Sequence, residues 1–315
     1  MYKAVDLCAC IGGIRLGFEQ AFGDKMRTVY AAEVDKFARK TYEANFNNSK
    51  YIFDTDFTDN RIGWIPTHDF LLAGFPCQAF SIAGKKKGFE DARGQLIWHI
   101  LRTVEAYRPK VLFFENVKHL VHLHHGEEFK AIVDRIEGYG YDVYWKVLNA
   151  KYFHVPQSRE RLYMVCFRNF DLNVKNFEFP EESEPDKIVA DILIEDQEKK
   201  WLSENYVAFI ERYNKEEKEL GSGFERKWLS RYSIAPTVCK SNGSRDRLLL
   251  IDYKEDGTRW YRKLSGRELA RLQGFPDDFK LPCSYYQTAR QLGNSVAVPV
   301  IKAIAEKIKD SLDEQ

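Results

Sequence analysis

Residues 70–81 read FLLAGFPCQAFS, and this stretch decides the fold class. Its first four residues form an apolar run of strand length, and Pro76 interrupts the chain directly before Cys77. A strand that ends here presents the thiol at the mouth of a sheet, the edge at which open α/β sheets bind ligands. A thiol held at a sharp turn is a candidate nucleophile, although a free cysteine is more often a small buried apolar residue.

Short apolar runs alternate with longer amphipathic stretches on both sides of this segment, as they do in βαβ units. We expect strands at residues 4–8, 28–32, 70–73, 111–115, 144–148 and 162–167, and helices at residues 14–21, 36–46, 95–107, 127–138 and 296–311. The pattern predicts an α/β fold with a doubly wound, mostly parallel sheet. It fails near Phe170, where charged and turn-rich sequence begins. We therefore expect a first domain at residues 1–193 and 284–315 and a second, smaller domain at residues 194–283.

The composition is that of a globular protein, with 44% hydrophobic and 30% charged residues in a chain of 315. The N-terminus lacks the regions of a signal peptide, and no run approaches membrane-spanning length, so no membrane partner is expected. The cysteines show no C-x-x-C spacing, which predicts six thiols in a reducing cytoplasm. They are Cys8, Cys10, Cys77, Cys166, Cys239 and Cys283.

The charge is unevenly distributed although the net charge is only +1. Residues 178–219 carry 6 Lys/Arg against 14 Asp/Glu, whereas residues 221–275 carry 12 against 6. The second stretch is a candidate polyanion-binding surface, and a solvated loop is the alternative.

A glycine loop follows the first predicted strand, because residues 8–13 read CACIGG. Glu33 ends the second predicted strand, where a carboxylate can accept hydrogen bonds from ribose hydroxyls. Cys10 occupies the position of the first glycine of a dinucleotide loop, so a nucleoside without phosphates, such as S-adenosylmethionine, fits better than a dinucleotide. Asp56 could accept from an adenine amino group. The structural alternative is a tight turn with a surface glutamate.

Three further motifs follow residues 76–78 in a fixed order: ENV at 115–117, QSRER at 157–161 and GNSV at 293–296. Together with GKKKGFEDARG at 84–94 and RELARLQGFP at 267–276, they make the chain resemble the C5-cytosine DNA methyltransferases of bacterial restriction–modification systems, particularly the small type II enzymes. Only residues 170–258 fall outside the resemblance. It implies a Rossmann-like S-adenosylmethionine-dependent methyltransferase fold with a target-recognition domain, S-adenosyl-L-methionine as cofactor, double-stranded DNA as partner, a monomer and no metal.

The resemblance also implies the roles of single residues. Cys77 would attack C6 of a cytosine that is flipped out of the duplex, and Glu115, kept protonated, would hydrogen-bond to N3 of that base. Arg161 would hold the carbonyl of the base. Arg159 would support the same loop as Arg161. Asn116 would order the strand end at Glu115, and Gln78 would hold the catalytic loop. A bacterial or phage-encoded enzyme of this kind would protect DNA from a cognate nuclease.

The resemblance assigns two further sets of residues. Cofactor binding would involve Asp6, Cys8, Ala9, Cys10, Gly12, Gly13, Glu33, Asp56, Phe57, Pro76, Leu96, Asn294 and Ser295. DNA binding would involve Ser81, Lys85, Arg93, Arg226, Arg231, Thr237 and Arg245. Two departures stand out: CAC at residues 8–10 replaces the usual Phe-Ala-Gly, and Ala83 stands where some relatives have a polar residue.

Other functions explain less of the sequence. A tRNA-directed relative would share the chemistry, but the stretch at residues 170–258 favours DNA. A Rossmann oxidoreductase gives Cys77 and Glu115 no role, and a catalytically silent DNA-binding protein would not need them. The histidines at positions 119, 122, 124 and 125 suggest a metal cluster, but no cysteine or spaced acid completes a site, so a solvated loop is the better interpretation.

Overall fold

The structure is a computed structural model that describes residues 1–46, 50–58, 62–75, 95–170, 172, 174, 177–195, 200–220, 226–241, 248–254 and 256–313. The chain forms two compact units. Unit 1 comprises Met1–Asn149, Glu160–Glu182 and Val300–Gln315, and unit 2 comprises Ala150–Arg159 and Ser183–Pro299. The assignment of target recognition to residues 194–283 concerns function and stays a prediction.

Within the described part of the chain, unit 1 is built on a seven-stranded sheet with the strand order β3-β2-β1-β4-β5-β8-β6. The strands are β1 (Tyr2–Leu7), β2 (Met26–Ala32), β3 (Ile52–Asp54), β4 (Phe70–Gly74), β5 (Val111–Val117), β6 (Tyr141–Asn149) and β8 (Glu160–Arg168). The first five of these strands in sheet order pair in parallel, and β8 runs antiparallel to both β5 and β6. The predicted doubly wound, mostly parallel sheet is therefore confirmed.

The strand order reverses at the centre of this sheet. From β1 the chain proceeds outward to β2 and β3, and it then returns to β4, which lies on the other side of β1 and continues to β5. The carboxyl ends of β1 and β4 thus form a topological switch point, the place where open α/β sheets bind ligands. The glycine loop and the segment that leads to Cys77 both start there.

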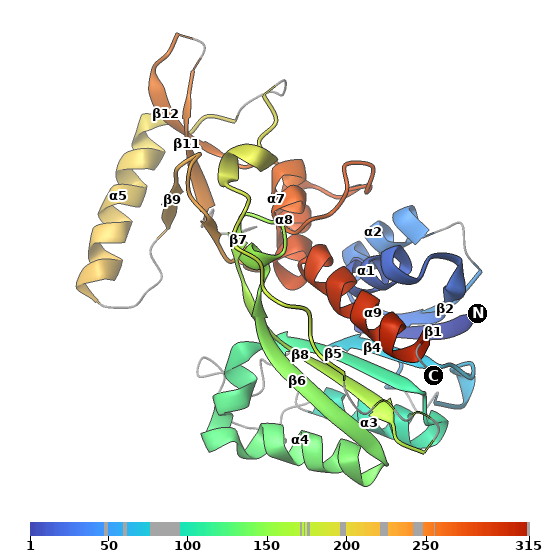
Figure 1. The fold of residues 1–315 in the computed structure, drawn as a ribbon. Coiled ribbons are helices and arrows are strands. Elements are labelled where there is room, and N and C mark those ends of the chain that lie inside the picture. Colours follow the sequence, from blue (N-terminus) through green and yellow to red (C-terminus); the bar gives the residue numbers. More distant parts are fainter. Residues whose placement is uncertain are drawn as a thin grey trace. The chain divides into compact units, whose positions relative to one another are not determined.

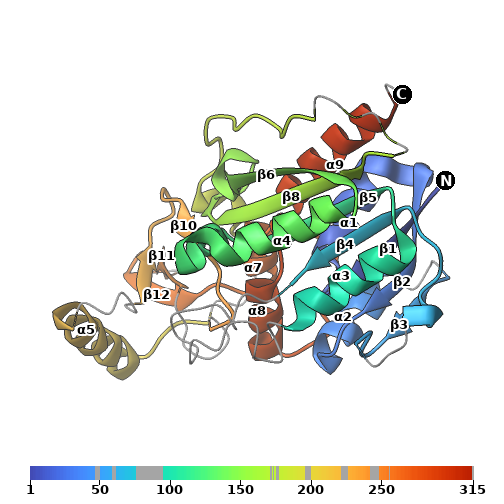
Figure 2. The ribbon, with the colours of Figure 1, turned by 90° about the horizontal axis from the view of Figure 1, so that it is seen from below.

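Helices cover both faces of this sheet (Figures 1 and 2). α3 (Gln95–Tyr107) and α4 (Glu127–Gly138) lie on one face, and α1 (Gly13–Phe22) and α9 (Val298–Asp313) lie on the other. α2 (Lys36–Phe46) follows β2. α1 and α9 approach closely, because a Cβ atom at Gly17 would lie 2.6 Å from Ile301.

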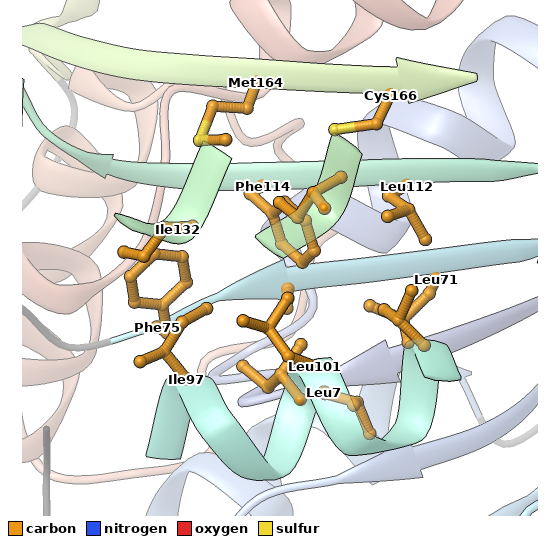
Figure 3. Close-up of a cluster of buried hydrophobic side chains, with 14 of the residues drawn as sticks. Leu7, Leu71, Phe75, Ile97, Leu101, Leu112, Phe114, Ile132, Met164 and Cys166 are labelled. Atoms are coloured by element: carbon orange, nitrogen blue, oxygen red, sulfur yellow. The ribbon is translucent and has the colours of Figure 1, made fainter. Parts of the chain in front are cut away.

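Alternate residues of the central strands point to the two helical layers. Figure 3 shows Leu71, Leu112 and Phe114 together with Ile97 of α3 and Ile132 of α4 in one buried cluster. On the opposite face, the Phe18 ring of α1 contacts the rings of Phe70 and Phe113, with centroid distances of 6.2 and 5.0 Å. The near-continuous apolar runs of β4 and β5 follow from this burial on both sides.

Unit 2 contains a three-stranded sheet with the order β12-β11-β9, and a short parallel pair of β7 with β10. Its elements are β7 (Gln157–Ser158), α5 (Glu204–Glu219), β9 (Lys227–Leu229), β10 (Ala235–Pro236), β11 (Leu248–Tyr253), β12 (Arg259–Lys263), α7 (Gly266–Leu272) and α8 (Tyr285–Asn294). Short 3-10 helices in the chain are Gly23–Lys25, Ile62–Trp64, Lys118–Gly126, Ala150–Tyr152 and Val189–Ile192. The guanidinium of buried Arg262 pairs with Asp252 at 2.6 Å and with Glu268 at 2.9 Å, which ties β11 and β12 to α7.

Candidate active site

The loop after β1 is a tight turn in an unusual backbone conformation. Cys8, Cys10 and Gly12 have φ angles of 55°, 49° and 86°. The N–H of Gly12 donates to the carbonyl of Ala9 at 2.8 Å, and α1 starts at Gly13. Left-handed φ angles are costly for residues with a side chain, so two cysteines in this region mark a strained segment at the switch point.

Gly12 is required by its packing as well as by its backbone. A Cβ atom at this position would lie 2.2 Å from the Phe46 ring and 3.1 Å from the Tyr42 ring, both on α2. An aromatic side chain thus fills the space at the Cα of Gly12. The glycine therefore joins the loop tightly to α2.

Glu33 is fixed by the same loop. One carboxylate oxygen accepts the N–H of Cys10 at 2.8 Å, and the other accepts the N–H of Asp35 at 2.8 Å. Burial raises the pKa of Glu33, and the two backbone hydrogen bonds oppose that shift. Each carboxylate oxygen has a second lone pair, so the half-buried group can still accept from the hydroxyls of a ligand.

Three further predicted cofactor residues, Asp56, Phe57 and Leu96, also lie in unit 1. Asp56 Oδ1 accepts from both the N–H and the hydroxyl of Thr58, at 2.9 and 2.6 Å. Phe57 is buried in the central apolar cluster, and Leu96 packs against that cluster from its edge. Asp56 is thus oriented by a local turn, with two apolar side chains in the supporting layer.

Asp6 is a completely buried carboxyl in β1. Its Oδ2 accepts from the Tyr42 hydroxyl at 3.1 Å, and Arg15 donates to the same hydroxyl at 3.3 Å. Burial raises the pKa of Asp6 to about 7, while Arg15 opposes the shift. Within the described residues, Asp6 Oδ1 has no hydrogen-bond partner. An unsatisfied acceptor beside the loop, together with the half-satisfied Glu33, suits a ligand that carries hydroxyl or ammonium donors, as S-adenosylmethionine does.

Glu115 and Arg161 meet at the carboxyl end of β5. Arg161 Nε lies 3.2 Å from Glu115 Oε1, and both side chains are largely buried. Gly74, the last residue of β4, is the register partner of Glu115, and a Cβ atom there would lie 3.6 Å from Glu115 Oε2. The carboxyl group therefore lies directly beside the segment that leads to Cys77.

Asn116 holds that segment in place. Its amide Nδ2 donates to the carbonyl of Phe75 at 3.0 Å, and its Oδ1 accepts the N–H of Val117 at 2.8 Å. Because Phe75 lies two residues before Cys77, the buried amide fixes the start of the catalytic loop relative to Glu115.

Several predicted site residues lie outside the described residues. They are Pro76, Cys77, Gln78, Ser81, Ala83, Lys85 and Arg93 in the catalytic loop, and Arg245 in the basic stretch. The described cysteines, Cys8, Cys10, Cys166, Cys239 and Cys283, carry thiols and no disulfide.

Unit 2 contains three more of the predicted catalytic and cofactor residues: Arg159, Asn294 and Ser295. Arg159 is buried, and its guanidinium donates to the carbonyls of Val238 and Ser295, the first at 3.0 Å. Asn294 is the exposed last residue of α8, and the hydroxyl of buried Ser295 has no partner within the described part of the chain. Arg159 thus supports the ends of two segments by hydrogen bonds to their backbone.

The predicted DNA-binding residues that the structure describes are all engaged within unit 2. The Arg226 guanidinium lies over the rings of Tyr206, Phe209 and Tyr213, with centroid distances of 5.6, 5.3 and 5.2 Å. Arg231 pairs with Glu195 and with Asp252, and the Thr237 hydroxyl donates to the carbonyl of Ser158 at 2.8 Å. These contacts position the basic stretch, and base contacts by these residues stay a prediction.

Two buried glutamines were missed as site residues from the sequence. Gln157 and Gln273 are fully buried and hydrogen-bonded to each other at 3.1 Å. Both lie in motifs quoted above, QSRER and RELARLQGFP, and a polar residue inside a motif next to apolar neighbours was the available signal. In the part of the chain that the structure describes, no helix is long and apolar enough to span a membrane, and no group of three or more His, Cys, Asp or Glu side chains could hold a metal ion.

The structure resembles solved methyltransferases over its full length. The methyltransferase EhMeth of Entamoeba histolytica matches with a TM-score of 0.80 at 18% identity, covering 99% of both chains. The DNMT2 protein of Spodoptera frugiperda matches with a TM-score of 0.76 at 20% identity, covering 99% of this chain and 100% of that one. The fold is that of these methyltransferases.

Sequence comparison narrows the class to one family. The model of the C-5 cytosine-specific DNA methylase family matches residues 2–310. The type II methyltransferase M.NlaX of Neisseria lactamica is 42% identical over 99% of this chain and 97% of its own length. M.HhaI of Haemophilus parahaemolyticus is 39% identical over 99% of this chain and 95% of its own. The chain therefore belongs to the C-5 cytosine-specific DNA methylases and is a DNA (cytosine-5)-methyltransferase of type II restriction–modification systems.

Proposed function

We propose that the enzyme methylates C5 of a flipped-out cytosine through a covalent Cys77 adduct. The observation that carries this proposal is the geometry at the end of β4. Gly74 lies beside Glu115, and Asn116 holds Phe75 by its carbonyl oxygen. A nucleophile and an acid at two adjacent parallel strand ends can reach the same base.

The proposed chemistry starts at C6 of the base. The Cys77 thiolate forms a bond to C6, and the electron pair of the C5–C6 double bond moves so that C5 becomes nucleophilic. The bound cofactor would supply its methyl group to C5, and the electron pair of the broken S–CH3 bond would stay on sulfur. A base then takes the C5 proton, the electron pair of that C–H bond restores the C5–C6 double bond, and the Cys77 thiolate leaves. Because C6 is shielded in a duplex, the cytosine must leave the base stack first.

The Glu115–Arg161 pair is the proposed binding site for the polar edge of the base. The two side chains neutralise each other at 3.2 Å when no base is present. In the proposed complex, Arg161 binds the base carbonyl and protonated Glu115 donates to N3, which neutralises the charge that builds up in the ring. Binding of the base thus replaces the contact between Glu115 and Arg161 by two contacts, one from each side chain to the base.

The residues at the switch point fit S-adenosyl-L-methionine. Glu33 would accept from the ribose hydroxyls and Asp56 from the adenine amino group. The unpaired Asp6 Oδ1 is a buried polar atom that such a ligand can satisfy. Ser295 is assigned to cofactor binding on the resemblance alone. The remaining proposed cofactor residues are Cys8, Ala9, Cys10, Gly12, Gly13, Phe57, Pro76, Leu96 and Asn294.

We assign catalysis and cofactor binding to residues 1–193 and 284–315, and target recognition to residues 194–283. The substrate is double-stranded DNA with a short specific site. The enzyme acts as a monomer in the bacterial cytoplasm, where the DNA lies, and methylation protects that DNA from a cognate nuclease. The basic balance of residues 221–275 supports contact with the DNA backbone.

The test is the transfer of tritiated methyl groups to duplex DNA and to tRNA. Cys77→Ser should abolish transfer while DNA and cofactor binding persist, and Cys283→Ser serves as the matched cysteine control. Glu115→Gln should lower the rate by about 10² to 10⁴ because an amide cannot supply a proton. Substantial turnover by Cys77→Ser would refute the covalent mechanism, and transfer to tRNA alone would refute the assigned substrate.

A randomised duplex library, sequenced after bisulfite treatment, would then identify the recognised site. Alanine variants of base-reading residues should relax the preference at one position, at a cost of about 1 to 3 kcal/mol, whereas variants of phosphate-binding residues should slow all sites alike. An unchanged preference in every variant of the basic stretch would place recognition elsewhere.

A further inference from the structure

Two buried side chains at β7 bind the segment that carries the predicted recognition residue Thr237. Gln157 Oε1 accepts the N–H of Val238 at 2.8 Å, and Arg159 Nη1 donates to the Val238 carbonyl at 3.0 Å. Both backbone groups of Val238 are therefore held by side chains that are at most 2% exposed. The pairing of β7 with β10, Gln157 with Ala235, sets the register of this contact.

The same side chains hold the end of α8. Gln157 Nε2 donates to Gln273 Oε1, and Gln273 Nε2 donates to the carbonyl of Leu292 at 2.7 Å. The second terminal nitrogen of Arg159 donates to the carbonyl of Ser295. A continuous set of hydrogen bonds, here called the amide–guanidinium network of Gln157, Arg159 and Gln273, thus joins segment 237–239 to segment 292–295.

The two segments also touch directly. A Cβ atom at Gly293 would lie 2.2 Å from the carbonyl carbon of Cys239 and 2.4 Å from the N atom of Lys240. Backbone packs on backbone at this point, so neither segment can shift without moving the other.

We propose that Gln157, Arg159 and Gln273 are positioning residues that couple recognition of the target site to cofactor binding. The proposal rests on the proposed function, because it takes Thr237 as a DNA contact and Asn294 and Ser295 as cofactor contacts. DNA binding shifts segment 237–239, and the rigid network moves the backbone of segment 292–295 with it. The moved segment binds the cofactor more tightly, and by linkage the cofactor strengthens DNA binding by the same factor.

The test compares cofactor affinity with and without DNA. S-adenosylhomocysteine, the product of methyl transfer, serves as the probe because it permits no turnover, and the DNA is a duplex with the site found in the library. For the wild type we expect the duplex to raise the affinity by about 5- to 150-fold. Arg159→Lys keeps the charge but lacks the fork that reaches two carbonyls, so it should reduce the effect to less than about twofold.

Arg262→Lys is the matched control. Arg262 is as deeply buried as Arg159 and lies in the same unit, but it binds Asp252 and Glu268 and neither of the two coupled segments. This variant should keep the wild-type DNA effect. Gln273→Met, which removes the bond to Leu292, provides a second test should Arg159→Lys fail to fold, as judged by circular dichroism.

The outcomes separate the two proposals. A folded Arg159→Lys or Gln273→Met variant with the full DNA effect would overturn the coupling role, as would an equal loss in Arg262→Lys, because that loss would be a general effect of destabilisation. A wild type that methylates DNA but binds the probe equally with and without the duplex would overturn the coupling and leave the proposed function intact. A wild type that methylates no DNA would contradict the proposed function itself.

Discussion

Replacement of Gly12 by alanine tests the idea that the cofactor loop is shaped by packing against α2. The new methyl group would lie 2.2 Å from Cε2 and 2.8 Å from Cζ of the Phe46 ring. This ring cannot simply turn away, because it packs against the tilted Tyr42 ring at a centroid distance of 4.7 Å and lies under the Arg15 guanidinium at 4.2 Å. Either the loop or α2 must therefore move.

The expected cost has two parts. A left-handed φ of 86° costs a residue with a Cβ atom about 1 to 2 kcal/mol. Forcing a methyl group into a packed core costs about 1 to 3 kcal/mol more. Gly140→Ala isolates the first part, because Gly140 also lies in unit 1, has a φ of 81°, and a Cβ atom there would lie 3.4 Å from its nearest neighbour, the side-chain oxygen of Asn169. Gly12→Ala should therefore destabilise unit 1 by about 1 to 3 kcal/mol more than Gly140→Ala does.

Urea-dependent hydrogen exchange of the β1 and β2 amides measures this difference within unit 1, independently of unit 2. The affinity for S-adenosylmethionine should fall together with the stability in Gly12→Ala and remain unchanged in Gly140→Ala. Equal destabilisation by the two substitutions would refute the packing argument, since the backbone term would then account for the whole effect.

Four further predictions follow from the site. In the free enzyme, the raised pKa of Asp6 means that it releases its proton near pH 7 instead of near 3.8, so between these values the folded protein holds a proton that the unfolded chain has lost. Relative to Asp6→Asn, the wild-type free energy of unfolding should therefore fall by about 4 kcal/mol as the pH rises from about 4 to 7. Urea titrations at several pH values would detect this fall. Cys10→Gly should relieve about 1 kcal/mol of left-handed strain, offset in part by the greater chain entropy of glycine, so thermal melts should show little loss. Glu33→Ala should weaken cofactor binding in calorimetry with the chemical step nearly unchanged at saturating cofactor. Arg226→Ala should destabilise unit 2 without changing site preference in the library, because its guanidinium already stacks on three rings.

The sequence predicted the sheet of unit 1 well because its strands are buried runs with clear boundaries. β4 and β5 begin at the predicted residues, Phe70 and Val111. β3 was not predicted, because three residues, Ile52–Asp54, are too short to show a period. The antiparallel direction of β8 was also not predicted, although residues 150–159 between β6 and β8 are fewer than a parallel crossover needs.

The site could be predicted only where a residue follows directly from a strand end. Glu115 and Asn116 lie at the end of a buried strand, so their place at the carboxyl edge of the sheet, one strand from the switch point, follows from the pattern. The ion pairs of Arg231 could not be inferred from the sequence, because its partners Glu195 and Asp252 are 36 and 21 residues away along the chain. Sequence reasoning therefore identified the family, whereas the contacts that position the basic stretch required the structure.

The strained conformation of the loop after β1 is held in place by the contacts around it. A cysteine with a φ of 49° would tend to relax, but the N–H of Cys10 is held by the Glu33 carboxylate at 2.8 Å. Gly12, two residues further, is packed against the Phe46 ring. The loop is therefore fixed at both ends, by β2 through a hydrogen bond and by α2 through packing. A strained segment that its surroundings over-determine keeps one conformation before a ligand arrives. Such preorganisation lowers the cost of ordering a binding site.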